Sequence, residues 1–111
     1  MPVLMVSEWQ GNSDDYDRTL EKVMQECPPD DRCSMHVMAV TGEDSFTVTE
    51  VWTDRAACES WFKQAMPTIE GTVGTTHKSW NVYDVHNLMT ADSGQEQAAE
   101  ATAGQANLTT V

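Results

Sequence analysis

Residues 45–62 read SFTVTEVWTDRAACESWF, and this stretch predicts a strand that passes through a cap into an amphipathic helix. Residues 45–52 are rich in β-forming residues, as in a strand. Asp54 is placed to cap the helix that follows. The apolar residues of that helix form one stripe: Ala57, Cys58, Trp61, Phe62, Ala65 and Met66. We expect Pro67 to end the helix, because proline lacks the backbone N–H of a helical hydrogen bond.

The strand of this stretch carries a carboxylate, Glu50, where an apolar residue is expected. In an alternating strand, Glu50 shares its face with Phe46, Val48 and Trp52. Burying a charged side chain among apolar ones is costly unless the charge has a partner. Glu50 is therefore the first candidate for a functional residue, and the side chain that lies opposite it decides its role.

The chain before this stretch predicts a first strand and a first helix. Residues 3–9 are a short apolar run with β-forming residues, ended by a turn. Asn12 or Ser13 can cap a helix whose first turn holds carboxylates, which favour the positive end of the helix dipole. The apolar positions of this helix make a single stripe: Tyr16, Leu20, Val23, Met24 and Cys27. We expect Pro28 and Pro29 to end it.

A hairpin and a last strand complete the predicted elements. Residues 33–40 and 45–52 are β-rich and are joined by a segment with glycine and acidic turn formers. Residues 68–78 make a connection long enough for a flap over a site, and residues 79–88 read as the last strand. The order strand, helix, strand, strand, helix, strand predicts an α+β, ferredoxin-like domain. In this βαββαβ fold, two helices cover one face of a four-stranded antiparallel sheet.

The register of the hairpin is open, and it decides what Glu50 meets. If three residues form the turn, Thr41 pairs with Ser45 and His36 lies opposite Glu50. If the register shifts by one residue, Thr49 lies opposite His36 and Glu50 falls on the other face. We favour the first register, because it gathers the large apolar residues onto one face.

One domain and a tail are expected. The domain spans residues 1–88, and residues 89–111 are rich in alanine, threonine, glutamine and acidic residues without any aromatic residue, which predicts a disordered acidic tail. In the domain, the sheet face away from the helices is uncovered, and the hairpin carries apolar residues on both faces. We therefore expect a homodimer in which a second subunit covers this face.

Charge and composition disfavour several classes of partner. The 111 residues carry a formal charge of -12, which repels phosphate backbones and anionic lipid, so neither nucleic acid nor a membrane is expected as a partner. No apolar run is long enough to span a bilayer and the start lacks the features of a secretion signal, so the expected location is the cytoplasm. The three cysteines form no CxxC pair, and strand spacing places Cys33 and His36 on opposite faces, so no metal site is expected.

With this order of elements, the stretch EVWTDRAACESWF resembles the dimeric α/β-barrel superfamily and, within it, the antibiotic-biosynthesis monooxygenase-like group. A strand that ends in Glu50 and Trp52, the cap Asp54 and the helix aromatic Trp61 carry the resemblance. It covers about residues 3–88. The resemblance implies a ferredoxin-like sheet that dimerises through its open face into an α/β barrel.

A closer similarity is to small, mostly uncharacterised actinobacterial-type members, which also carry a histidine in the second strand and one near the end of the fourth, here His36 and His86. At three positions, this chain differs from family members whose reactions depend on a particular side chain. Val48 stands where the anthrone-type monooxygenases have an asparagine, and Gly71 stands where the haem degraders have a histidine. Pro67 replaces the histidine of the plant-type polyketide cyclase. The similarity therefore indicates a fold more than a reaction.

Glu50 and His36 are the candidate catalytic residues. A carboxylate in a cleft beside a histidine can act as a general base next to a carbonyl, which suits ring closure and also the enolate formation that precedes cofactor-free oxygenation. The alternative is that the two form a cross-strand pair that holds the hairpin in register. The candidate substrate-binding residues have aromatic, imidazole or thioether side chains: Trp52, Trp61, His86 and Met38. For the two tryptophans, core packing is the simpler interpretation.

Two functions stay open. The leading hypothesis is a small enzyme of secondary metabolism that needs no cofactor and acts on an apolar polycyclic or polyketide-like molecule, as a monooxygenase or a polyketide cyclase. The chain offers no Gly-rich phosphate loop and no metal-ligand set. The alternative is a non-catalytic ligand-binding protein or dimeric scaffold of the same fold. The missing asparagine and histidines favour that alternative.

Overall fold

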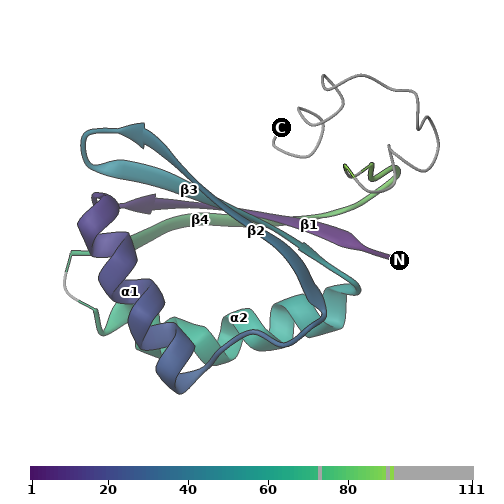
Figure 1. Ribbon diagram of the computed structural model, residues 1–111, viewed down its shortest axis with the longest axis horizontal. Helices are drawn as coiled ribbons and strands as arrows, with labels where there is room; N and C mark the ends of the chain where they lie inside the picture. Colours follow the sequence, from purple (N-terminus) through teal and green to yellow (C-terminus); the bar gives the residue numbers. More distant parts are fainter. Residues whose placement is uncertain (73, 90, 92–111) are drawn as a thin grey trace.

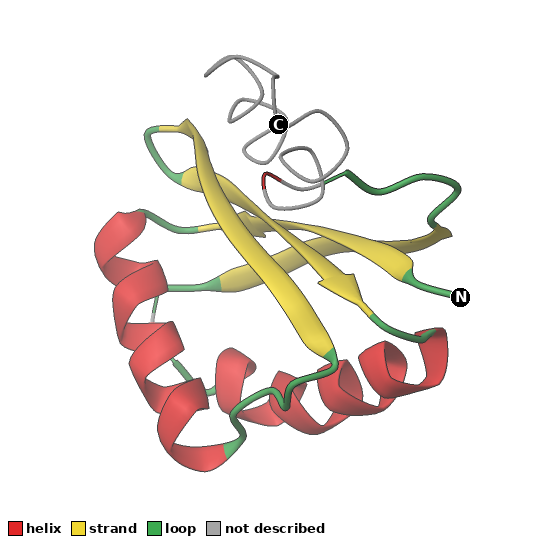
Figure 2. Cartoon of the chain, turned by 45° about the vertical axis from the view of Figure 1, so that its right-hand side comes forward, coloured by secondary structure: helices red, strands yellow, loops and turns green. Residues whose placement is uncertain are grey.

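A four-stranded antiparallel sheet with helices on one face makes up the domain (Figures 1 and 2). The computed structural model describes residues 1–72, 74–89 and 91. In chain order the elements are β1 (Val3–Gln10), α1 (Ser13–Glu26), β2 (Cys33–Gly42), β3 (Ser45–Trp52), α2 (Arg55–Glu70) and β4 (Thr76–Asp84). The strands lie in the order β2-β3-β1-β4, and neighbouring strands are antiparallel. The predicted ferredoxin-like fold is confirmed.

Side chains cap the first turns of both helices. The Asp15 N–H donates to the Asn12 side chain and the Asn12 N–H donates to the Asp15 side chain, so α1 begins with a reciprocal capping box. The Ala57 N–H donates to the Asp54 carboxylate at 2.7 Å at the start of α2. These bonds satisfy N–H groups that have no partner within the helix. The predicted helix starts are confirmed.

α2 continues through Pro67 to Glu70, so the prediction that this proline ends the helix is wrong. Proline removes one helical hydrogen bond, but its carbonyl still accepts, and the Gly71 N–H donates to it at 3.1 Å. The added turn also buries Ile69 in the core. Burial of this side chain offsets the lost bond. The connection to β4 is consequently the segment 71–75, which is shorter than the connection expected over 68–78.

The last strand lies closer to the N-terminus than predicted and occupies Thr76–Asp84. Asp84 pairs with Val3, the first residue of β1, and beyond this pair the Val85 N–H donates to the Pro2 carbonyl at 2.9 Å. His86 therefore lies beyond the sheet and is exposed. The predicted tail, except for residues 89 and 91, falls outside the described residues.

The hairpin of β2 and β3 has the favoured register, with His36 opposite Glu50. The turn differs in detail, because Gly42 pairs with Ser45 and the extra residue, Thr41, lies in a bulge. A bulge adds one residue to one strand only, so the pairing beyond it keeps the register that a three-residue turn predicts.

A second irregularity lies near the start of β2, between Cys33 and Met35. It places Cys33 opposite Trp52 and therefore on the same sheet face as His36. The prediction that Cys33 and His36 lie on opposite faces is wrong, since a bulge shifts the alternation of side chains by one residue.

The core lies between one sheet face and the helices. α2 lies against the sheet, whereas α1 packs chiefly against α2. The largest fully buried side chains come from the sheet and from α2: Trp52, Met5, Glu50, Val3, Cys58 and Ser7. A carboxylate is thus among the most buried groups of the protein.

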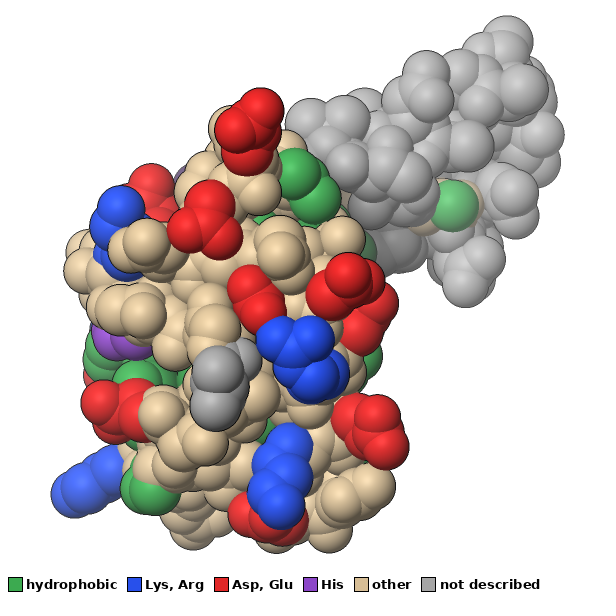
Figure 3. Space-filling view, turned by 90° about the vertical axis from the view of Figure 1, so that its left-hand side faces the viewer, with side chains coloured by type: hydrophobic (Ala, Val, Ile, Leu, Met, Phe, Trp, Pro, Cys, Tyr) green, Lys and Arg blue, Asp and Glu red, His purple; other side chains and the backbone are tan. Residues whose placement is uncertain are grey.

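The surface has acidic side chains interspersed with fewer basic ones, as Figure 3 shows for one face. On that face, the Lys and Arg side chains are scattered and do not form a continuous basic patch. Of the helices in the described part of the chain, none has the length and apolar character needed to cross a membrane.

Candidate functional site

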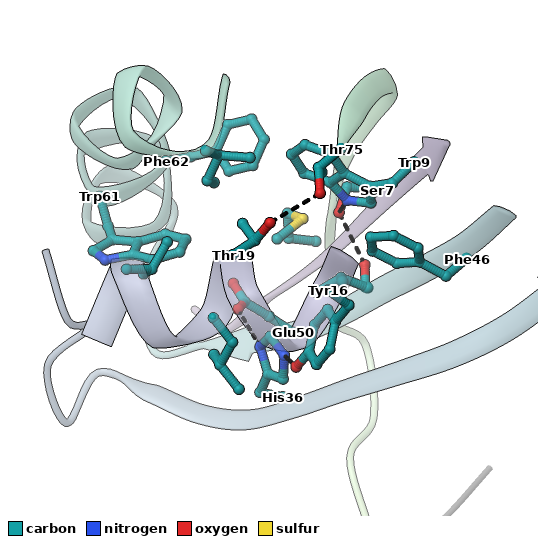
Figure 4. Close-up of a pocket in the computed structure, with 15 residues that line it drawn as sticks. Ser7, Trp9, Tyr16, Thr19, His36, Phe46, Glu50, Trp61, Phe62 and Thr75 are labelled. Atoms are coloured by element: carbon teal, nitrogen blue, oxygen red, sulfur yellow. Dashed lines mark hydrogen bonds and ion pairs between the residues drawn. The ribbon is translucent and has the colours of Figure 1, made fainter. Parts of the chain in front are cut away.

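A cavity of about 60 Å³ lies between the core face of the sheet and the two helices (Figure 4). Much of its wall is aromatic: Trp9, Tyr16, Phe46, Trp61 and Phe62. Tyr16 comes from α1, Trp61 and Phe62 come from α2, and the other two come from the sheet. These rings make the interior suited to an apolar molecule.

Glu50 is the buried charged group of this cavity. Its side chain is 1% exposed, and both carboxylate oxygens have partners. The Trp52 Nε1–H donates to Glu50 Oε1 at 2.9 Å, and His36 Nδ1 lies 2.6 Å from Glu50 Oε2. Two strands therefore hold the carboxylate in a fixed orientation, because Trp52 lies on the same strand and His36 lies across from it.

The other nitrogen of His36 continues the chain of hydrogen bonds to α1. His36 Nε2 lies 2.6 Å from the Tyr16 hydroxyl, and Figure 4 shows the imidazole between the Tyr16 ring and Glu50. Tyr16 in turn packs edge-on against Phe46, with ring centroids 5.6 Å apart. The chain Trp52–Glu50–His36–Tyr16 thus crosses from the core of the sheet to the helix that covers the cavity.

The donors and acceptors of this chain allow one consistent arrangement when Glu50 is a carboxylate and His36 is a neutral imidazole. A carboxylate only accepts, so His36 Nδ1–H donates to Glu50 and Nε2 accepts the hydrogen of the Tyr16 hydroxyl. Burial raises the pKa of Tyr16, and the nearby Glu50 and Asp17 carboxylates raise it further. Tyr16 is therefore held as a neutral phenol, which is the form that can donate to His36.

Hydroxyl groups form a second polar region of the cavity wall. Thr19 Oγ1 lies 2.8 Å from Thr75 Oγ1 and donates to the Asp15 carbonyl at 2.8 Å. Ser7 accepts from Trp9 Nε1–H at 2.7 Å and donates to the Val48 carbonyl at 3.2 Å. These hydroxyl hydrogens are used within the protein, so this region offers mainly acceptors to a bound molecule.

The cysteines nearest to Glu50 are protonated thiols. Burial is the main cause that raises the pKa of Cys33 to about 12 and the pKa of Cys58 to about 11, and the Glu50 carboxylate adds to both. Because the thiolate is the nucleophilic form of cysteine, neither thiol is suited to nucleophilic chemistry near neutral pH.

The structure brings some of the predicted site residues together and leaves others apart. His36, Glu50 and Trp61 line the cavity. Trp52 lies behind Glu50 and supports it through the indole hydrogen bond. Met38 packs against the core from β2 without lining the cavity. His86 does not reach the cavity, because β4 ends before it.

Sequence reasoning missed the hydroxyl-bearing residues of the site. Tyr16 lies on the apolar stripe of α1, which the spacing assigned to core packing. Its polar hydroxyl was the available signal, since a buried tyrosine usually finds a hydrogen-bond partner for this group. Thr19 and Thr75 carried no comparable signal, because their contact joins α1 to the segment before β4 across 56 positions of sequence.

Several solved structures share this fold. A candidate antibiotic biosynthesis monooxygenase from Deinococcus radiodurans aligns with a TM-score of 0.57 and 14% identity, over 79% of this chain and 96% of that chain. SnoaB, a cofactor-independent oxygenase from Streptomyces nogalater, aligns with a TM-score of 0.55 and 13% identity, over 79% of this chain and 96% of that chain. Rv0793 from Mycobacterium tuberculosis aligns with a TM-score of 0.60 and 11% identity, over 81% of this chain and 100% of that chain.

Comparisons at the level of sequence find no match. No protein-family model matches the chain, and no curated protein matches it significantly. The structural matches show that the chain has the fold of the antibiotic-biosynthesis monooxygenase-like proteins. They confirm the resemblance seen in the sequence as a likeness of fold. Its chemistry has to be argued from the cavity itself.

Proposed function

We propose that this protein is a small enzyme that abstracts a proton from an apolar, polyketide-like aromatic substrate without a cofactor, and that it acts as a monooxygenase. The observation that carries the proposal is the Glu50–His36–Tyr16 chain, which ends at an aromatic-walled cavity. A histidine oriented by a carboxylate is a recurrent general base, because the carboxylate holds the imidazole in one tautomer and stabilises its charged form.

Reaction with dioxygen follows from the same proton abstraction. An anthrone-type substrate that loses a proton becomes an electron-rich enolate, and this anion can react with dioxygen itself. The ring CH2 group and one dioxygen molecule give a ring carbonyl and one water molecule, so the atoms balance without an external reductant. The apolar wall favours this course because it keeps water away from the anion.

A polycyclic substrate requires the cavity to open. Pockets for ligands of that size span roughly 300–1,000 Å³, and this cavity measures about 60 Å³. α1 is the element best placed to move, since it packs chiefly on α2 and contributes Tyr16 to the cavity wall. We propose that substrate displaces the second half of α1, which contributes Leu20 and Val23 to the wall, while the first half keeps the contact of Tyr16 with His36.

Oxygen uptake tests the proposal. The protein is mixed with 1,8-dihydroxyanthrone, and dioxygen consumption is compared with the spontaneous rate in buffer. His36→Gln should lower the catalysed rate by roughly 10²–10⁴-fold, the usual contribution of a general base. His86→Gln is the matched control, because His86 is exposed and does not line the cavity. If the wild-type protein does not exceed the spontaneous rate, oxygenation of this substrate class is excluded.

A polyketide cyclase would use the same base. In that reaction, the enolate formed by proton abstraction attacks a second carbonyl of the same molecule. Product analysis by mass separates the two reactions, because oxygenation of the anthrone adds one oxygen atom and removes two hydrogen atoms, whereas aldol closure with dehydration removes water.

A non-catalytic ligand-binding protein is the second candidate. The small volume of the cavity and the internally satisfied hydrogen bonds of Glu50 favour it, since a satisfied pair can serve only to hold the hairpin. Trp61→Ala should then lower the affinity for the same anthrone in calorimetry, while neither this variant nor the wild-type protein consumes dioxygen.

A homodimer is part of the proposal. The sheet face away from the helices carries Val6, Val37 and Thr49 side by side across three strands. Val37 and Tyr83 on this face are 39% and 53% exposed in the single chain. A second copy that pairs with this face would remove the exposed apolar surface from water.

A further inference from the structure

We infer that the Tyr16 hydroxyl is the group of this site that touches the substrate, and that it relays a proton from a phenol or enol hydroxyl of the substrate to His36. The inference rests on the proposed acid–base function of the same cavity. Tyr16 then has a catalytic role, His36 accepts the proton from Tyr16, and Glu50 orients His36.

Glu50 is not free to meet a substrate. One of its oxygens accepts the Trp52 indole N–H and the other accepts from His36, and the side chain is 1% exposed. A substrate proton could reach this carboxylate only if the bond to His36 opened. Glu50 is therefore a positioning residue that orients the imidazole and stabilises its positive charge.

His36 is not free either. Nδ1 is engaged with Glu50 and Nε2 with the Tyr16 hydroxyl, each at 2.6 Å. Both distances are at the short end for hydrogen bonds, as expected where one partner is charged or polarised. The next atom along the chain that a substrate can approach is the Tyr16 oxygen.

The Tyr16 oxygen can accept while its hydrogen is donated to His36. A phenolic oxygen keeps acceptor capacity when its hydrogen is used, so a hydroxyl group of a substrate can donate to it. A C–H group makes a much weaker hydrogen bond. The geometry therefore favours a substrate that presents an acidic O–H, as a phenol or an enol does. The enol tautomer of an anthrone presents such a group, and its loss of this proton gives the same enolate as loss of a proton from the ring CH2 group.

The transfer involves two protons and no other reactant. The substrate O–H bond breaks and its proton bonds to the Tyr16 oxygen, while the original Tyr16 O–H bond breaks and that proton bonds to His36 Nε2. The products are a substrate oxyanion, an unchanged Tyr16 and an imidazolium that faces the Glu50 carboxylate. The substrate loses one unit of positive charge and His36 gains it, so the net charge of the complex is unchanged.

The raised pKa of Tyr16 is consistent with this role. A phenol with a raised pKa loses its own proton only as it gains one from the substrate. Tyr16 therefore passes a proton on, and the negative charge forms on the substrate. The Phe46 ring, in edge contact with Tyr16, holds the phenol in place during the exchange.

A coloured phenol tests the relay without any turnover. Only the phenolate form of 4-nitrophenol absorbs visible light strongly. The visible absorbance therefore gives the ionised fraction of the bound probe at a pH where the free probe is mostly neutral. Bound probe is quantified by equilibrium dialysis. We expect the wild-type protein to increase the ionised fraction about tenfold relative to free probe, as one charge-assisted hydrogen bond can.

The variants are Tyr16→Phe and His36→Gln, with Tyr83→Phe as the matched control. Tyr83 is the other tyrosine of the chain and lies exposed on the opposite sheet face. Tyr16→Phe keeps the ring contact with Phe46, and thermal unfolding verifies that each variant is folded. We expect Tyr16→Phe and His36→Gln to bind the probe but leave it neutral, and Tyr83→Phe to behave as the wild-type protein.

Each other outcome is decisive. If Tyr16→Phe ionises the probe as the wild-type protein does, His36 takes the proton directly and the relay is wrong. Failure of the wild-type protein to bind or ionise the probe also overturns the relay. If the probe is ionised but 1,8-dihydroxyanthrone is not oxidised, the relay stands and the proposed oxygenation fails. If the anthrone is oxidised equally by wild type and Tyr16→Phe, the relay alone fails.

Discussion

His36 Nδ1 lies 2.6 Å from Glu50 Oε2, and this contact joins the edge strand β2 to its neighbour β3 inside the domain. The two side chains differ sharply in exposure, at 34% for His36 and 1% for Glu50. The imidazole therefore connects a deeply buried carboxylate to a partly exposed part of the cavity wall. An interaction of this kind is stronger in the interior than in water, because the local dielectric is low.

Glu50→Gln should lower turnover by roughly 10²–10⁴-fold and leave substrate affinity nearly unchanged. The amide keeps the size of the side chain and an acceptor for Trp52, but it removes the charge that stabilises the imidazolium. Oxygen uptake measures turnover and calorimetry measures affinity. Glu43→Gln, in the exposed turn of the hairpin, is the control. Full activity in Glu50→Gln would remove this carboxylate from the mechanism.

Tyr16 should ionise above its ordinary value of 10.0, because burial and the Glu50 carboxylate raise its pKa. In Tyr83→Phe it is the remaining tyrosine, so near-ultraviolet absorbance follows its titration alone. A midpoint at or below 10.0 would contradict the burial of the phenol beside the Glu50 carboxylate.

The same shift predicts how stability depends on alkaline pH. A raised pKa favours the neutral phenol in the folded state, so its stabilisation is complete below pH 10.0 and is lost as pH rises through the folded pKa. The two thiols lower the free energy of unfolding in the same way, because burial raises their pKa values from 9.0 to about 12 for Cys33 and to about 11 for Cys58. The unfolding free energy from urea titrations should therefore fall above pH 10 less steeply in Tyr16→Phe than in the wild-type protein.

Trp52→Phe should destabilise the protein more than Trp80→Phe does. The Trp52 indole N–H donates to a buried carboxylate, and losing a hydrogen bond to a charged group costs about 1.5–3 kcal/mol. Trp80 stacks on Phe62, and its buried Nε1 has no hydrogen-bond partner within the described part of the chain. Both substitutions remove the same atoms, but Trp52 is fully buried and Trp80 is partly buried, so the difference between their unfolding free energies combines the indole bond with the tighter packing of Trp52. Equal losses would show that the bond to Glu50 adds little.

Thr49→Lys should convert the proposed dimer into a monomer. Thr49 pairs with Val6 and Val37 at the middle of the open sheet face, where a charged side chain would be buried against the second copy without a partner. Light scattering with size-exclusion chromatography gives the mass in solution. Met24→Lys on the exposed surface of α1 introduces the same charge away from this face and should leave the mass unchanged. A wild-type monomer would contradict the dimer directly.

Local sequence signals were sufficient for most of the elements. The capping signals, Asn12 or Ser13 for α1 and Asp54 for α2, predicted both helix starts together with the helical stripes, because these signals act within a few residues of each other. The β-rich composition of residues 45–52 predicted β3 with its observed bounds. Pro67 misled the prediction of a helix end, since burial of Ile69 lies outside the local pattern.

The sequence by itself determined the order of the elements, the ferredoxin-like fold and the placement of Glu50 on the core face of β3. Only the tertiary structure decided how that carboxylate is satisfied. The pairing with His36 keeps its register because the bulge at Thr41 compensates for the closer pairing of Gly42 with Ser45, and Tyr16 reaches His36 from a helix twenty positions earlier in the chain. Contacts between distant segments form because packing brings whole elements together. A periodic sequence pattern indicates which face of an element is buried, but it does not indicate which side chains meet there.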